Sequence, residues 1–135
     1  MPAMIFVNLP VTDIVRATAF YTALGFTANP AFSDETTTCI VVSDTIYVMI
    51  MTRERFAGFA PRPIGDPSRE TAVLIALTRD SRAGVDAFLT AALAHGGSDN
   101  AKPQDYGFMY SQSVSDPDGN VLEVVWMDPA ATGGT

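Results

Sequence analysis

The sequence predicts an α+β protein in which one structural unit occurs twice, as two repeated βαβββ modules. The order strand, helix, hairpin is found over about residues 4–51 and again over about residues 72–126. The expected helices also share letters, since AFYTA at residues 19–23 matches AFLTA at residues 87–91. Agreement between the order of elements and the shared letters favours duplication over coincidence.

The first module begins with a short apolar strand and an amphipathic helix. The strand covers residues 4–9 and is expected to end at Pro10, which has no N–H to donate. Thr12 or Asp13 can cap the helix that follows, and Gly25 supplies a left-handed residue that ends it.

A hairpin completes the first module. Its β-rich runs, residues 37–43 and 46–51, are separated by only a short polar turn. A further strand is expected around residues 28–33. The letters VSD occur in this hairpin at residues 42–44 and in the second one at residues 114–116.

The second module repeats this order. An apolar strand over residues 72–78 precedes a helix that Asp80 or Ser81 can cap and that ends at Gly96. The remaining strands are expected at residues 99–102, 108–115 and 121–126, with the turn sequence Asp-Pro-Asp-Gly at residues 116–119.

Residues 52–71 connect the modules and are rich in proline, glycine and arginine. This composition predicts a connecting loop that holds about one helical turn. We expect residues 1–135 to form a single domain, because the chain has the length of one ordinary domain.

Composition excludes several classes of partner. Eight basic and fifteen acidic residues give a formal net charge of −7, which disfavours nucleic acid and anionic membrane surfaces. Cys39 is the only cysteine and cannot form an internal disulfide, which suits a reducing cytosol. The apolar runs are too short to span a bilayer and no basic segment precedes them, so we expect a cytoplasmic protein without a signal peptide.

Several phrases resemble the vicinal oxygen chelate superfamily, which includes glyoxalase I, bleomycin-resistance proteins, fosfomycin-resistance enzymes and extradiol dioxygenases. They are NLPVTD at residues 8–13, FY and LGF within residues 20–26, and DPDGNVLE at residues 116–123. The resemblance covers about residues 5–126 and includes a branch labelled predicted lactoylglutathione lyase. It implies a mixed, strongly curved sheet around a cleft, with helices outside. It also implies a homodimer, because members commonly complete their clefts across subunits.

The resemblance also implies where a divalent metal would bind. Phe6, Met49 and Leu74 stand at three of the superfamily's four ligand positions, and Glu123 stands at the fourth. Phenyl and isobutyl groups offer no donor atom, and a thioether is a poor ligand for such metals. We therefore expect no metal cofactor.

Glu123 is the strongest single candidate for a functional residue. It lies among valines, and strand alternation places it on the same face as Val121 and Val125. An unpaired charge is costly to bury, so this carboxylate must form an ion pair, stay protonated, or open into a water-filled cleft. In a cleft it could accept a proton or hold a cationic group.

The other candidates have structural alternatives. Asn8 shares the face of Phe6, although an amide bonded to neighbouring backbone is the more ordinary interpretation. Tyr106 and Tyr110 stand where the resemblance implies the rim of the cleft, and there they bind an apolar ligand or simply pack. His95, the only histidine, is interpreted as a cap at the end of a helix.

Two classes of function follow. The first is metal-free binding of a small apolar or cationic molecule, similar to the bleomycin-resistance proteins. The second is an enzyme that uses Glu123, either a lyase or isomerase similar to lactoylglutathione lyase or a dioxygenase-type enzyme. A cleft filled by side chains would instead favour an interaction module.

Overall fold

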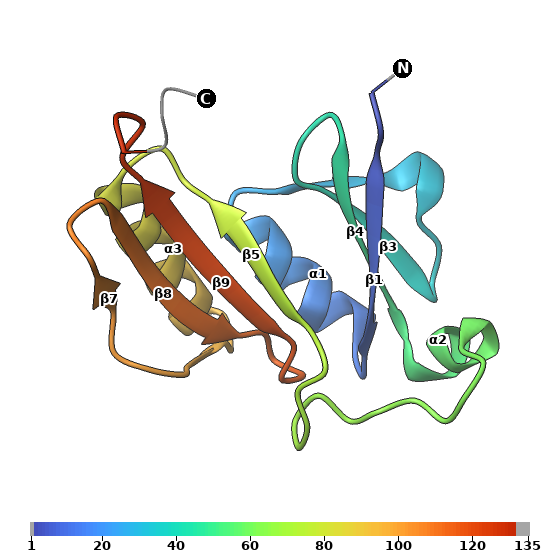
Figure 1. Ribbon diagram of the computed structural model, residues 1–135. Coiled ribbons are helices and arrows are strands. Elements are labelled where there is room, and N and C mark those ends of the chain that lie inside the picture. The colour runs from blue at the N-terminus through green and yellow to red at the C-terminus, as the bar shows by residue number, and fades with distance from the viewer. Residues whose placement is uncertain (1, 132–135) are drawn as a thin grey trace. The chain divides into compact units, whose positions relative to one another are not determined.

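The computed structural model describes residues 2–131, which divide between two compact units, Met1–Asp66 and Pro67–Thr135. Each unit contains one mixed β-sheet with helices (Figure 1). The described residues form nine strands and three α-helices, so the predicted α+β class is confirmed. The boundary between the units falls inside the predicted connecting loop, residues 52–71.

Four strands form the sheet of the first unit: β1 (Ile5–Val11), β2 (Thr27–Asn29), β3 (Thr37–Val41) and β4 (Ile46–Thr52). Their order is β1-β4-β3-β2, with β1 parallel to β4 and the other neighbours antiparallel. The helix α1 (Ile14–Ala23) packs on β3 and β4, and the hydroxyl oxygens of Thr18 and Thr38 lie 2.9 Å apart at this contact. Thr38 and the other even-numbered residues of β3 therefore face α1.

β1 continues through Pro10 to Val11, so the prediction that it ends before Pro10 is wrong. The reason is that β1 lies at the edge of its sheet. The N–H of Ile5 donates to the carbonyl oxygen of Thr45 at 2.8 Å, and alternation then directs odd-numbered N–H groups toward β4. Pro10 lies on the outward side, where a missing N–H breaks no hydrogen bond of the sheet.

The strand expected over residues 28–33 is shorter than predicted. β2 covers only Thr27–Asn29, and a 3-10 helix, η1 (Pro30–Phe32), takes up most of the remainder. Its first residue is a proline, whose fixed φ suits the start of a helical turn. The side chain of Asn29 accepts a hydrogen bond from the N–H of Ala31 at 3.0 Å, which stabilises that turn.

The connecting loop contains more helix than the single turn expected. The helix α2 covers Arg53–Phe59, directly after β4. The side chain of Thr52 caps it by accepting a hydrogen bond from the N–H of Arg55 at 3.2 Å.

Asp13 and Ser81 are the residues that cap the two longer helices. The side chain of Asp13 accepts a hydrogen bond from the N–H of Arg16 at the start of α1. Ser81 accepts one from the N–H of Gly84 at the start of α3 (Arg82–Ala94). Over residues 2–131, no helix has the length and apolar character needed to cross a membrane.

Five strands form the sheet of the second unit: β5 (Leu74–Thr78), β6 (Ser98–Asp99), β7 (Gln104–Asp105), β8 (Met109–Ser115) and β9 (Val121–Met127). The order is β5-β9-β8-β6, and β7 pairs with the far end of β8. As in the first unit, the first strand is parallel to the last, and the preceding strand is antiparallel to it. This agreement confirms the repeated module.

The helix α3 covers one face of the second sheet (Figure 1). On β8 and β9, Val114, Leu122 and Val124 are fully buried on this side. The alternating residues of β9, including Glu123, are only partly buried on the other side. We call that other side the open face of the second sheet.

Candidate functional site

Glu123 lies on the open face of the second sheet, between Ala76 of β5 and Ser113 of β8. Its side chain is partly exposed, and its neighbours along β9 on this face are Val121 and Val125. Among the described residues, the side chain of Glu123 has no hydrogen-bonding or ion-pair partner. The carboxylate is therefore available to a molecule that reaches this face.

Leu74 lies on the same face as Glu123. It pairs with Val121 across β5 and β9, two residues along β9 from Glu123. Its side chain is 59% exposed, which is unusual for a leucine in a strand. The structure thus brings a carboxylate and an exposed apolar side chain together.

Phe6, Asn8 and Met49 lie together in the first unit, on the sheet face turned away from α1. Phe6 is 51% exposed and stacks on Tyr47, with ring centroids 4.8 Å apart. The side-chain amide of Asn8 donates to the carbonyl oxygen of Phe6 at 3.2 Å, which is the local backbone contact considered from the sequence. This face therefore also presents apolar side chains.

Tyr110 lies on the α3 side of β8 and not on the open face. Its hydroxyl donates to a carboxylate oxygen of Asp86 on α3 at 2.6 Å, and the amide of Gln112 donates to the same oxygen at 2.7 Å. The hydrogen bond to Asp86, together with burial, raises the pKa of Tyr110. Tyr110 is thus separated from Glu123 by the sheet itself.

Tyr106 lies in the loop between β7 and β8. The residue is 57% exposed, and its ring centroid lies 6.4 Å from that of Phe108, which is also exposed. The two rings form a pair of exposed aromatic side chains at the tip of this loop.

Arg82 holds this loop through contacts with Asp105 and Gly107. The sequence did not reveal these contacts, because they join residues far apart in the chain. The guanidinium of Arg82 donates to both carboxylate oxygens of Asp105, at 2.7 and 2.9 Å, and to the carbonyl oxygen of Gly107 at 2.9 Å. It also lies over the rings of Tyr110 and Trp126, at 5.2 and 5.0 Å from their centroids. These contacts form the Arg82 brace, in which the bidentate pair lowers the pKa of Asp105 to about 2.

The chain is similar to known proteins in part of its sequence and in its fold. Residues 4–43 match the family model for the bleomycin resistance protein-like N-terminal region. A glyoxalase/bleomycin resistance protein/dioxygenase family enzyme from Burkholderia phytofirmans PsJN superposes with a TM-score of 0.76 at 20% identity, covering 93% of this chain and 99% of that one. The chain has the vicinal oxygen chelate fold.

Two further structures share this fold. The bleomycin resistance determinant encoded on the transposon Tn5 has a TM-score of 0.63 at 20% identity, over 93% of this chain and 98% of that one. Lactoylglutathione lyase from Agrobacterium tumefaciens has a TM-score of 0.66 at 21% identity, over 93% and 94%. No curated protein sequence matches the chain. At these identities the likeness shows the fold, and the function must be argued from the residues.

The residues at the positions where the resemblance implies metal ligands do not fit a divalent metal. Phe6 and Leu74 have no donor atom, and Met49 offers only a thioether. Within residues 2–131, no group of three or more histidine, cysteine, aspartate or glutamate side chains could hold a metal ion. Glu123 alone retains a suitable donor at these positions.

Proposed function

We propose that the protein binds a small apolar or cationic molecule without a metal ion, on the open face that carries Leu74 and Glu123. Tyr106 is a further contact residue in the second unit. Phe6, Asn8 and Met49 form a candidate binding face of the first unit by itself. Tyr110 is left out of the proposal, because its hydroxyl is bound to Asp86 on the other side of the sheet.

The observation that carries the proposal is the environment of Glu123. A carboxylate that is partly exposed among apolar side chains, without a protein partner in the described chain, gains most from a cation that also has apolar surface. The net charge of −7 attracts such a molecule at longer range. The shared fold with a bleomycin resistance determinant agrees with a binding role.

A pair of matched probes tests the proposal. Benzyltrimethylammonium and neopentylbenzene have the same shape and differ in the charge at one atom. We expect the cation to raise the melting temperature of the protein more than the uncharged probe does. In Glu123→Gln the ratio of the affinity for the cation to the affinity for the uncharged probe should fall about tenfold, which corresponds to about 1.4 kcal/mol. Isothermal titration calorimetry measures the dissociation constants of both probes.

Glu35→Gln is the matched control. Glu35 is an exposed residue of the first unit, and this variant changes the net charge by the same amount as Glu123→Gln. It should retain the full preference for the cation. The proposal is wrong if neither probe stabilises the protein, or if both variants bind the cation equally well.

An enzyme of the lyase or isomerase type is the second candidate function. The unpartnered carboxylate of Glu123 can accept a proton, and one structure with the same fold is a lactoylglutathione lyase. Formation of lactoylglutathione from methylglyoxal and glutathione tests it. This function requires turnover that is lost in Glu123→Gln at an unchanged melting temperature.

A further inference from the structure

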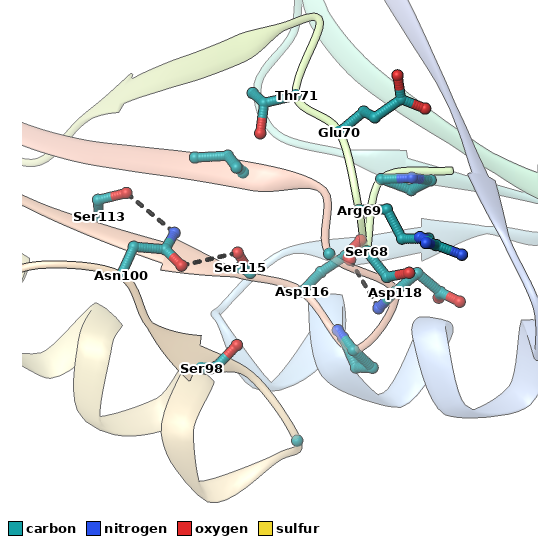
Figure 2. A pocket seen from close by; sticks show the side chains of 15 residues that line it. Ser68, Arg69, Glu70, Thr71, Ser98, Asn100, Ser113, Ser115, Asp116 and Asp118 are labelled. Carbon is teal, nitrogen blue, oxygen red and sulfur yellow. Dashed lines mark hydrogen bonds between the residues drawn. The ribbon is translucent and has the colours of Figure 1, made fainter. Parts of the chain in front are cut away.

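A polar pocket lies within the second unit (Figure 2). Its volume is about 580 Å³, within the size range of small-molecule sites. Ser113, Ser115 and Val121 line it where β8 and β9 meet the turn at residues 116–119. Ser98 and Asn100 line one side, and residues 67–71, which we call the strap, line the other.

The serines of β8 are an unusual choice for the middle of a sheet. Ser111, Ser113 and Ser115 alternate along the open face of a strand that has neighbours on both sides. Serine packs less apolar surface than the β-branched residues that strands favour. The repeated letters VSD align Ser113 with Val41 of the first unit, where the same position is apolar. The second module therefore has hydroxyl groups where packing alone favours aliphatic side chains.

Asn100 joins two of these hydroxyl groups into a network. Its Nδ2 donates to the Oγ of Ser113 at 3.1 Å, and its Oδ1 accepts from the Oγ of Ser115 at 3.0 Å (Figure 2). The network leaves Ser113 its own proton to donate and leaves Ser115 its lone pairs to accept. Asn100 retains a second N–H. The pocket therefore presents both donors and acceptors on uncharged groups that are already held in place.

The charges around the pocket disfavour an anion. Three carboxylates line it, from Glu70, Asp116 and Asp118, against one guanidinium, from Arg69. The carboxylate of Asp116 is fixed by the turn, since it accepts hydrogen bonds from the N–H groups of Asp118 and Asn120. A phosphate or carboxylate ligand would meet net negative charge here.

The pocket also has apolar surface and a fixed wall. Pro67, Pro117 and Val121 provide C–H groups against which a saturated ring can pack. The strap packs closely on Gly119, because a Cβ there would lie 2.5 Å from the carbonyl oxygen of Pro67. The strap thus passes directly over the turn at residues 116–119.

We propose that this pocket binds an uncharged, hydroxyl-rich ligand of the size of a monosaccharide or cyclic polyol. Hydroxyl groups of such a ligand both donate and accept, which matches Ser113, Ser115 and Asn100. Its ring carbons match the prolines and Val121. Glu123 does not line this pocket, although Ser113 pairs with it across β8 and β9, and binding of the polyol does not require a cation at Glu123.

Two-dimensional amide NMR spectra test the site, with methyl glucopyranoside, methyl mannopyranoside and myo-inositol as probes at millimolar concentrations. At least one probe should give saturable shifts confined to the strap, residues 98–100 and residues 113–121. Ser113→Val and Asn100→Leu should each weaken this binding about tenfold, because a ligand hydroxyl then lacks its partner. Valine suits a strand better than serine does, so Ser113→Val should remain folded.

Ser111→Val is the matched control, since Ser111 lies on the same face of β8 but outside the pocket. It should bind the probe as the unmodified protein does. The proposal is wrong if no probe gives saturable shifts, if Ser113→Val binds normally, or if inorganic phosphate binds there in preference. Asn100→Leu should leave the affinity for benzyltrimethylammonium unchanged, so failure at either site is distinguished from failure at the other.

Discussion

Gly119 allows the strap to approach the turn closely, because it has no side chain. Its φ of +100° lies in the left-handed region, and an added Cβ would lie 2.5 Å from the carbonyl oxygen of Pro67 and 2.7 Å from Cα of Ser68. An alanine must therefore strain the backbone and also displace the strap. We expect Gly119→Ala to lower the free energy of unfolding by about 2–5 kcal/mol, measured by urea denaturation.

Gly25 offers a control for the backbone contribution alone. Its φ is +103°, but no other heavy atom lies within 4 Å of an added Cβ. Gly25→Ala should lower the free energy of unfolding by only about 1–2 kcal/mol. Equal losses in the two variants would show that the strap does not approach Gly119 closely.

Single residues differed in how far the sequence could predict their roles. Glu123 stood out because a carboxylate among valines needs a physical reason, and the structure shows it on the open face without a partner in the described chain. Ser113 and Ser115 did not stand out, because the sequence alone does not show that their strand lies in the middle of a sheet. Their arrangement depends on Asn100, which follows β6 and hydrogen-bonds to both serines of β8. The sequence could not show that Tyr110 and Glu123 lie on opposite faces of the sheet. That conclusion also requires the register of β8 on β9, which only the structure gives.

The loop between β7 and β8 is held by the Arg82 brace, and its stability should depend on pH. The pKa of Asp105 is lowered from 3.8 to about 2, mainly by the hydrogen bonds from Arg82. Because the folded-state pKa is the lower one, the stabilisation is complete above pH 3.8 and is lost as the pH falls through 2. The N–H of Gly107 donates to Asp105 at 2.9 Å, so its amide shift should titrate with a midpoint of about 2.

Two variants check this assignment. Asp105→Asn should abolish the low-pH titration of the Gly107 amide, because no carboxylate remains. Arg82→Lys should move the midpoint upward toward 3.8, since an ammonium group cannot donate to both carboxylate oxygens at once. A midpoint of 3.8 in the unmodified protein would contradict the brace.

The main elements were predictable because each has a local signal. Helix starts follow from capping residues such as Asp13 and Ser81, and hairpins follow from β-rich runs that flank turn residues. The errors had different causes, and one of them was tertiary structure. β1 passes through Pro10 because it is an edge strand, a fact that local sequence does not contain. The helix α2 was underestimated because proline and glycine around it suggested a loop.

Across the whole molecule, duplication predicted the fold better than any single motif did. Both sheets pair their first and last strands in parallel. This arrangement joins Ile5 to Ile46, 41 residues apart, and Leu74 to Val121, 47 residues apart. Shared letters in corresponding places indicated two equivalent modules, so recognising one predicted the other. The pairing itself is not visible in one chain's sequence, because strand period fixes which face a residue occupies and not which strand lies beside it.

Each unit leaves an apolar edge strand exposed, which leads to a prediction about assembly. β1 carries Ile5 and Phe6, and β5 carries Leu74, all more than half exposed. Unpaired edge strands with apolar side chains are prone to association, and covering them with a second copy removes this exposure. We expect native mass spectrometry to show a dimer of twice the 14.4 kDa chain. Leu74→Lys should shift it toward the monomer, whereas Val15→Lys, at an exposed position of α1, should not. A monomer in the unmodified protein would mean that these strands are covered in another way.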